Sequence, residues 1–167
     1  MCSSDLVTAF ARLADARPAL RLVVAGADGW GADAVRDAVA RSGHTTRILR
    51  PGYLPADALA PLLRRAALVA YPSLEEGFGL PALEALACGA PVVTTTGSAM
   101  ADVCGDAARL VPPARPDLLA DAMAEVLDDA EVADRLRTAG PARAAGFTWD
   151  GAVEAHLRAY RLAVGAA

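Results

Sequence analysis

Short apolar runs alternate along the chain with longer segments in which apolar residues recur every three or four positions. Such runs are typical of strands buried in a parallel sheet, and the spaced segments are typical of amphipathic helices. The runs that we predict as strands span residues 20–25, 46–50, 68–71, 92–93 and 107–111. This alternation predicts an α/β fold, a Rossmann-like three-layer arrangement in which helices cover both faces of a parallel sheet.

The helical periodicity accounts for most of the remaining chain. The segments that we predict as helices span residues 5–16, 32–41, 56–65, 80–88, a short part of 94–103, 116–127, 130–139 and 149–164. The first of these precedes the first clear strand, although doubly wound folds of this kind begin with a strand. We therefore expect the first strand of the fold to be missing from this chain.

The segment from residue 68 to residue 93 contains the strongest candidate site. A strand is followed by a turn in which Gly77 and Gly79 flank Phe78, so the backbone can approach a ligand closely. Pro81 suits the first turn of a helix, where its missing N–H would have no partner. The free amides of this helix then lie at the carboxyl end of a strand, where open α/β sheets bind ligands and where helices attract phosphates.

Glu84 stands in a helix whose other positions from Leu80 to Cys88 are apolar. A helix that is apolar all round is normally buried, and a buried carboxylate needs a partner. One interpretation is a salt bridge to an arginine, or a helix end that leaves the carboxylate in water. The other is a ligand with hydroxyl groups, because a carboxylate accepts two hydroxyl hydrogen bonds well, as it does from a nucleotide ribose.

A second glycine motif, Gly29 to Ala34, matches the dinucleotide pattern G-x-G-x-x-A. The next predicted strand ends in Arg50 instead of the acidic residue that would bind a ribose. The glycines are explained more simply as a flexible turn between a strand and a helix.

The composition further limits the classes of function that this chain can have. The 167 residues suffice for one domain, and 54% hydrophobic with 22% charged residues fit a globular protein. The net charge of −4 argues against a nucleic acid partner. All sixteen basic residues are arginines, so this chain supplies no lysine for a Schiff base or a Walker-type phosphate site.

The cysteines and histidines show no functional spacing. Cys2, Cys88 and Cys104 have no paired pattern, which favours a reduced, cytoplasmic setting. His44 and His156 are isolated, so we expect no metal site. No apolar stretch approaches the length that spans a bilayer, and the N-terminus lacks a signal pattern.

The segment from Glu76 to Ala85, followed by Gly89-Ala90-Pro91-Val92-Val93, resembles the E-x7-E signature of retaining family 4 glycosyltransferases of the GT-B fold. This segment contains both glutamates, the glycine turn and the proline of that signature. The sequence Gly-x-Pro-Val-Val follows the predicted helix, as it does in the family. The similarity extends from the strand at residue 20 to Trp149. It implies that the chain, residues 1–167, is a single nucleotide-sugar-binding domain, the C-terminal half of such an enzyme.

The resemblance assigns roles to individual residues. Glu84 would hold the ribose hydroxyls, and Glu76, the catalytic candidate, would contact the donor sugar. The turn and helix start that would face the sugar and phosphates comprise Gly77, Phe78, Gly79 and Leu80. Arg50 and Tyr53 would lie beside the nucleobase, although each residue is more often a solvated arginine or a packing tyrosine.

The resemblance also implies parts beyond this chain. The family's arginine and lysine for the diphosphate, and an N-terminal acceptor domain, would precede it, and the helix at 149–164 would cross to that domain. The substrate would be a nucleoside-diphosphate sugar such as GDP-mannose, with no cofactor, and the full-length enzyme leaves room for peripheral membrane association. We expect the isolated chain to transfer little or no sugar. The alternative is a stand-alone nucleotide-binding or interaction module without catalysis.

Overall fold

A computed structural model describes residues 3–29 and 31–165, so Cys2 and Trp30 lie outside the described residues. Strands and helices alternate as the apolar pattern predicts. The strands are β1 (Leu22–Ala25), β2 (Ile48–Gly52), β3 (Val69–Tyr71), β4 (Val92–Thr95) and β5 (Ala108–Val111). The helices are α1 (Ser3–Ala14), α2 (Ala32–Arg41), α3 (Ala56–Arg65), α4 (Leu80–Ala87), α5 (Ala99–Cys104), α6 (Pro116–Asp128), α7 (Ala130–Ala144) and α8 (Trp149–Ala163).

All strand pairs are parallel, which confirms the predicted α/β class. The strands form two sheets instead of one continuous sheet: β1 pairs with β2, and β4 lies between β3 and β5. In the Rossmann strand order 3-2-1-4-5-6, the first strand stands in the middle of the sheet. The division between β1 and β3 falls at the place where that strand would stand.

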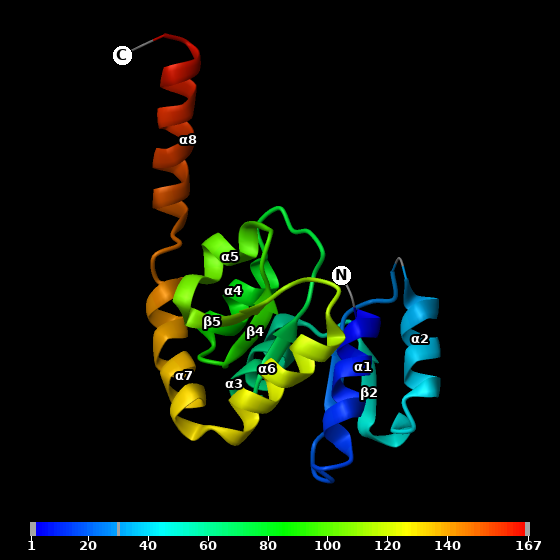
Figure 1. Cartoon of the computed structure of the whole chain (residues 1–167). Helices are drawn as coiled ribbons and strands as arrows, with labels where there is room; N and C mark the ends of the chain where they lie inside the picture. Colours follow the sequence, from blue (N-terminus) through cyan, green and yellow to red (C-terminus); the bar gives the residue numbers. More distant parts are fainter. Residues whose placement is uncertain (1–2, 30, 166–167) are drawn as a thin grey trace.

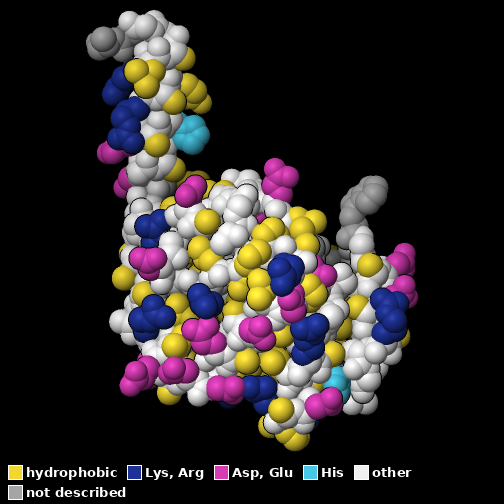
Figure 2. Space-filling model, in the orientation of Figure 1, with side chains coloured by type: hydrophobic (Ala, Val, Ile, Leu, Met, Phe, Trp, Pro, Cys, Tyr) yellow, Lys and Arg dark blue, Asp and Glu magenta, His cyan; other side chains and the backbone are white. Residues whose placement is uncertain are grey.

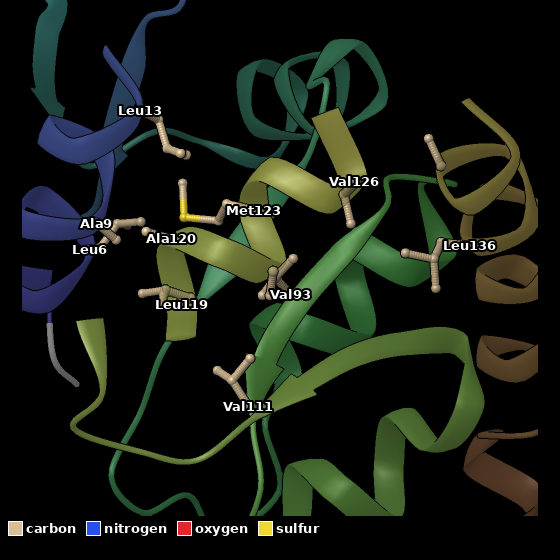
Figure 3. Packing of buried hydrophobic residues seen from close by; sticks show 12 residues of the cluster. Leu6, Ala9, Leu13, Val93, Val111, Leu119, Ala120, Met123, Val126 and Leu136 are labelled. Atoms are coloured by element: carbon tan, nitrogen blue, oxygen red, sulfur yellow. The ribbon is translucent and has the colours of Figure 1, made fainter. Parts of the chain in front are cut away.

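Helices cover both faces of the three-stranded sheet. Adjacent residues of β4 point to opposite faces, so Val93 packs beneath α1 and α6 while Val92 packs beneath α4 and α5. All four residues of β4 are buried, because the strand is central and covered on both sides. Figure 3 shows Val93 with Leu119 and Met123 of α6, within the larger of these clusters.

Helix α1 joins the two sheets through side-chain packing. Its residues Leu6 and Leu13 belong to the same cluster as α6, and Leu22 of β1 and Ala70 of β3 both pack against that cluster. The other face of α1 contributes Val7 and Phe10 to a separate cluster with α2 and β2. Figure 1 shows α1 between α2 and α6, so this helix holds the smaller sheet to the rest of the molecule.

Several predicted boundaries differ from the structure by one or two residues: α1 spans residues 3–14 instead of 5–16, and β1 begins at Leu22 instead of Leu20. Residues Thr45–Arg47 form a 3-10 turn, so β2 begins two residues later than predicted and continues to Gly52. The helix predicted to end at Ala139 continues to Ala144, through Gly140 and Pro141. Packing against α4 explains this continuation, because Gly140 lies directly on the backbone of Leu86 and tertiary contacts outweigh the local helix-breaking tendency.

Helix α8 extends away from the body of the molecule (Figure 1). It has no buried residue, and its large apolar side chains are exposed. Figure 2 shows apolar side chains along this helix beside arginines. Of the helices that the structure describes, none has both the length and the apolar character needed to cross a membrane.

Candidate functional site

The turn between β3 and α4 presents backbone amides that have no internal partner. Gly79 precedes α4 with φ 94°, and no side chain caps the helix. Within the described part of the chain, no acceptor is found for the N–H groups of Gly77, Phe78, Gly79 or Leu80. Consecutive free amides at a helix N-terminus favour an anion or another strong acceptor.

The conformation of this turn depends on Gly79 being glycine. A Cβ atom at this position would lie 2.6 Å from Cγ of Met100, a fully buried residue of α5. The positive φ would add strain for any residue that carries a side chain. The glycine therefore allows α4 to begin close against α5.

Two hydroxyl groups hold the carboxylate of Glu76. The Tyr71 hydroxyl donates to Oε1 over 2.9 Å, and Ser73 Oγ lies 3.0 Å from the same oxygen. Glu76 is half-buried, and the described residues provide no partner for its Oε2. One carboxylate oxygen is thus occupied while the other stays available to a ligand.

Threonine hydroxyls of β4 fix the backbone beneath this carboxylate. Thr94 Oγ1 donates to the Tyr71 carbonyl over 2.8 Å, and Thr95 Oγ1 donates to the Ser73 carbonyl. Both threonines are buried in the centre of the sheet. Partial burial, and then the hydrogen bond to Glu76, raise the pKa of Tyr71 to about 12. Its phenol therefore remains a donor at neutral pH.

The burial expected all round the helix of Glu84 is wrong. The helix side that contains Leu80, Glu84 and Ala87 is exposed, so the carboxylate stands in water, as one of the alternative interpretations holds. None of the residues described forms an ion pair with it, which rules out the arginine alternative among them. Only the opposite side of α4, with Ala82, Ala85 and Leu86, is buried.

Phe78 connects the turn to the segment before α8. Its ring meets that of Phe147 edge to face, with centroids 5.7 Å apart. The Arg143 guanidinium lies 5.3 Å from the centre of the Phe147 ring, and its Nε donates to the Val103 carbonyl. This chain of contacts joins the turn, the end of α7 and α5.

Of the two residues predicted to lie beside a nucleobase, one is ion-paired and the other is exposed to solvent. Arg50, in β2, forms an ion pair with Asp28, which also bonds Arg36 over 3.0 Å. Tyr53 is 76% exposed and follows the same strand. The charge of Arg50 is therefore balanced by Asp28 within the chain.

A polar hollow of about 550 Å³ lies beside Asp28, Gly31 and Arg36, in the region of the second glycine motif.

Comparison with known proteins identifies the family. The family described as glycosyl transferases group 1 matches residues 3–143. The chain belongs to this family. The O-antigen chain mannosyltransferase B of Escherichia coli is 33% identical over 141 residues, covering 84% of this chain and 37% of that protein.

A second relative of this glycosyl transferase chain is the D-inositol 3-phosphate glycosyltransferase of Kribbella flavida. It is 36% identical over 170 residues, covering 95% of this chain and 40% of that protein. The chain thus spans about two fifths of the length of these curated relatives.

Solved structures confirm the Rossmann-like half of a GT-B fold. Sucrose-phosphate synthase from Thermosynechococcus elongatus superposes with a TM-score of 0.83 at 27% identity, over 99% of this chain and 43% of that one. Anabaena HepE, solved in complex with UDP and glucose, gives a TM-score of 0.74 at 25% identity, over 85% of this chain and 39% of its own.

The sequence pattern did not point to several residues that shape this candidate site. Ser73, Thr94 and Thr95 are buried polar residues at the ends of predicted strands, which is a signal that could have singled them out. No sequence signal reveals that Phe147 reaches Phe78. No cluster of His, Cys, Asp and Glu able to hold a metal was found in the described residues.

Proposed function

We propose that this chain is the donor-binding half of a retaining glycosyltransferase that uses a nucleoside-diphosphate sugar. The observation that carries the proposal is the run of four acceptor-free amides, Gly77 to Leu80, between two available carboxylates, Glu76 and Glu84. Amides suit phosphate oxygens, and carboxylates suit sugar hydroxyls. A sugar nucleotide contains both kinds of group.

Each part of the turn has a role in this proposal. The exposed carboxylate of Glu84 accepts hydrogen bonds from the ribose, and Oε2 of Glu76 accepts one from the donor sugar. The free amides face the sugar and the phosphates. Removing one preorganised donor of this kind from other enzymes raises the barrier by roughly 3–4 kcal/mol, so the turn should affect rate as well as binding.

The reaction breaks the bond between the anomeric carbon and the diphosphate and forms a bond to an acceptor hydroxyl, whose proton leaves with the diphosphate. The name of the Escherichia coli relative supports mannose as the transferred sugar, and GDP-mannose is our first candidate donor. No metal and no cofactor takes part. The cations that neutralise the diphosphate would come from a segment that precedes α1, and the acceptor site would lie in an N-terminal domain, so the chain alone should transfer little or no sugar.

Glu84→Ala tests the proposed site directly. The purified chain is titrated with UDP, GDP and ADP, and its thermal unfolding is followed. A nucleotide present at one hundred times its dissociation constant should stabilise the wild type by about 2.7 kcal/mol. The variant should show little stabilisation, because its ribose ligand is gone.

Glu154→Ala is the matched control, since it removes the same charge from the exposed helix α8. It should respond to the nucleotide as the wild type does, and the responding nucleotide identifies the base. A folded wild type that responds to none of the three nucleotides would refute the donor-site proposal.

A second candidate function is an interaction module without catalysis. The observation that favours it is the unburied apolar side of α8, where Trp149 is 88% and Leu162 81% exposed. Such a surface commonly binds another protein surface. This function predicts partner binding that is unchanged in Glu84→Ala.

A further inference from the structure

The Tyr71 hydroxyl is committed to a single acceptor. In the region that the structure describes, its one hydrogen-bond partner is Oε1 of Glu76. Tyr71 is the last residue of β3, and Glu76 follows five positions later, beyond Pro72 and the bend at Leu74. This hydrogen bond therefore closes the first part of the turn and connects the carboxylate to the rigid sheet.

The second hydroxyl near this carboxylate is shared. Ser73 Oγ lies 3.0 Å from Oε1 of Glu76 and 3.1 Å from the carbonyl of Glu75, and a serine hydroxyl has one proton. It can therefore donate fully to only one of these acceptors. Tyr71 is the donor that serves Glu76 alone.

The donor itself is fixed in place. The Tyr71 carbonyl accepts a hydrogen bond from Thr94 Oγ1, and Tyr71 pairs with Thr94 in the register of β3 and β4. Thr94 is fully buried. The Tyr71 side chain also packs against the buried residues of α4 and α5, so its phenol has little freedom to move and determines the position of Oε1.

We infer that Tyr71 is a positioning residue for Glu76: it occupies Oε1 and leaves Oε2 as the oxygen that accepts a hydroxyl of the bound sugar. This inference rests on the proposed function and adds a residue to which neither the E-x7-E spacing nor the glycine turn points. The carboxylate then favours sugar nucleotides over free nucleotides. A fixed Oε2 accepts a hydrogen bond from a sugar hydroxyl and contributes nothing to the binding of a nucleotide that lacks the sugar.

The ratio of two affinities tests this role. Dissociation constants of the chain are measured for GDP-mannose and GDP, and for UDP-glucose and UDP, by calorimetry. Tyr71→Phe should weaken the sugar nucleotide about tenfold, the effect of losing one hydrogen bond to a charged group, and the free nucleotide less than about twofold. Ser73→Ala should have a smaller effect in the same direction.

Tyr160→Phe is the matched control, because it removes the same hydroxyl from the exposed helix α8. Its affinities should equal those of the wild type. A merely structural role for Tyr71 would weaken both ligands equally and would leave the ratio unchanged.

A spectroscopic titration provides a readout without ligand. The chain has three tyrosines, and at about pH 11 an ordinary phenol is mostly ionised. The difference in tyrosinate absorbance between the wild type and Tyr71→Phe reports Tyr71, while circular dichroism shows that the chain is folded. Tyr71 should ionise later than an ordinary phenol, and it should ionise earlier in Glu76→Gln.

The outcomes separate the two proposals. If the wild type binds neither the nucleotides nor the sugar nucleotides, the proposed function fails, and the positioning role fails with it. If the wild type binds both and the ratio is unchanged in Tyr71→Phe, only the positioning role is refuted. If Tyr71 ionises identically in the wild type and in Glu76→Gln, the positioning role is refuted by this result alone.

Discussion

At the scale of single residues, Gly79 determines whether the turn can lead into α4 while α4 packs closely against α5. Gly79→Ala introduces a side chain at φ 94°, which costs about 1–2 kcal/mol, and places Cβ 2.6 Å from Cγ of the buried Met100. We expect a loss of stability above the backbone cost alone, together with weaker nucleotide binding. Urea unfolding monitored by circular dichroism measures the loss.

Gly97→Ala is the control for the backbone cost. Gly97 also has positive φ, 84°, but a Cβ atom there meets nothing within 4 Å. The difference between the two variants isolates the contact with Met100. Equal losses would show that Met100 moves aside freely and that packing does not fix the turn.

The two glutamates of the motif show what the sequence could and could not predict for single residues. Their spacing, and their place in a turn and a helix, were readable from the chain. Their environments were not, because the burial of Glu76 depends on Tyr71 and the exposure of Glu84 depends on which side of α4 is covered. The pair of Arg50 with Asp28 was hidden for the same reason, since it joins β2 to the loop that follows β1.

At the scale of elements, the contact between α4 and α7 determines how closely the site is supported. Gly140 of α7 lies against α4, and a Cβ atom there would be 2.9 Å from the Leu86 carbonyl oxygen and 3.3 Å from its Cα. Alanine normally stabilises a helix interior relative to glycine by about 0.5–1 kcal/mol. We expect the opposite sign here, a destabilisation of about 1–2 kcal/mol from overpacking, measured by chemical denaturation.

Ala142→Gly reports the helix propensity of the same segment. Ala142 is exposed, so this change should cost about 0.5–1 kcal/mol without any effect on packing. If Gly140→Ala instead stabilised the chain, α4 and α7 would be able to move apart, and their close contact would not contribute to stability.

Most element positions were predictable because each depends on a local pattern. The predicted bounds of α2 and α3, Ala32–Arg41 and Ala56–Arg65, agree with the structure. The continuation of α7 through Pro141 was not predictable, because the contact of Gly140 with α4 that favours it comes from residues distant in sequence. The division into two sheets likewise depends on which strand edges meet.

At the scale of the whole molecule, α8 contributes exposed surface without contributing to the core. Truncation after Thr148 removes this helix and keeps Phe147, whose ring contacts Phe78. We expect the free energy of unfolding to change by less than about 0.5 kcal/mol, because no residue of α8 is buried. Chemical denaturation measures the stability, and sedimentation velocity measures association.

The truncated chain should associate less than the full chain at the same concentration, because the apolar side of α8 is gone. A marked loss of stability in dilute, monomeric solution would instead mean that α8 folds back onto the body.

The division between β1 and β3 affects how stability is distributed between the two sheets. Among the strands that the structure describes, no backbone ladder crosses from one sheet to the other, so the side-chain packing of the α1 leucines and their neighbours links the two sheets. Side-chain contacts resist separation less cooperatively than a continuous ladder does. We therefore expect the smaller sheet with α2 to open as a separate cooperative unit while the unit that holds Glu76 and Glu84 stays folded.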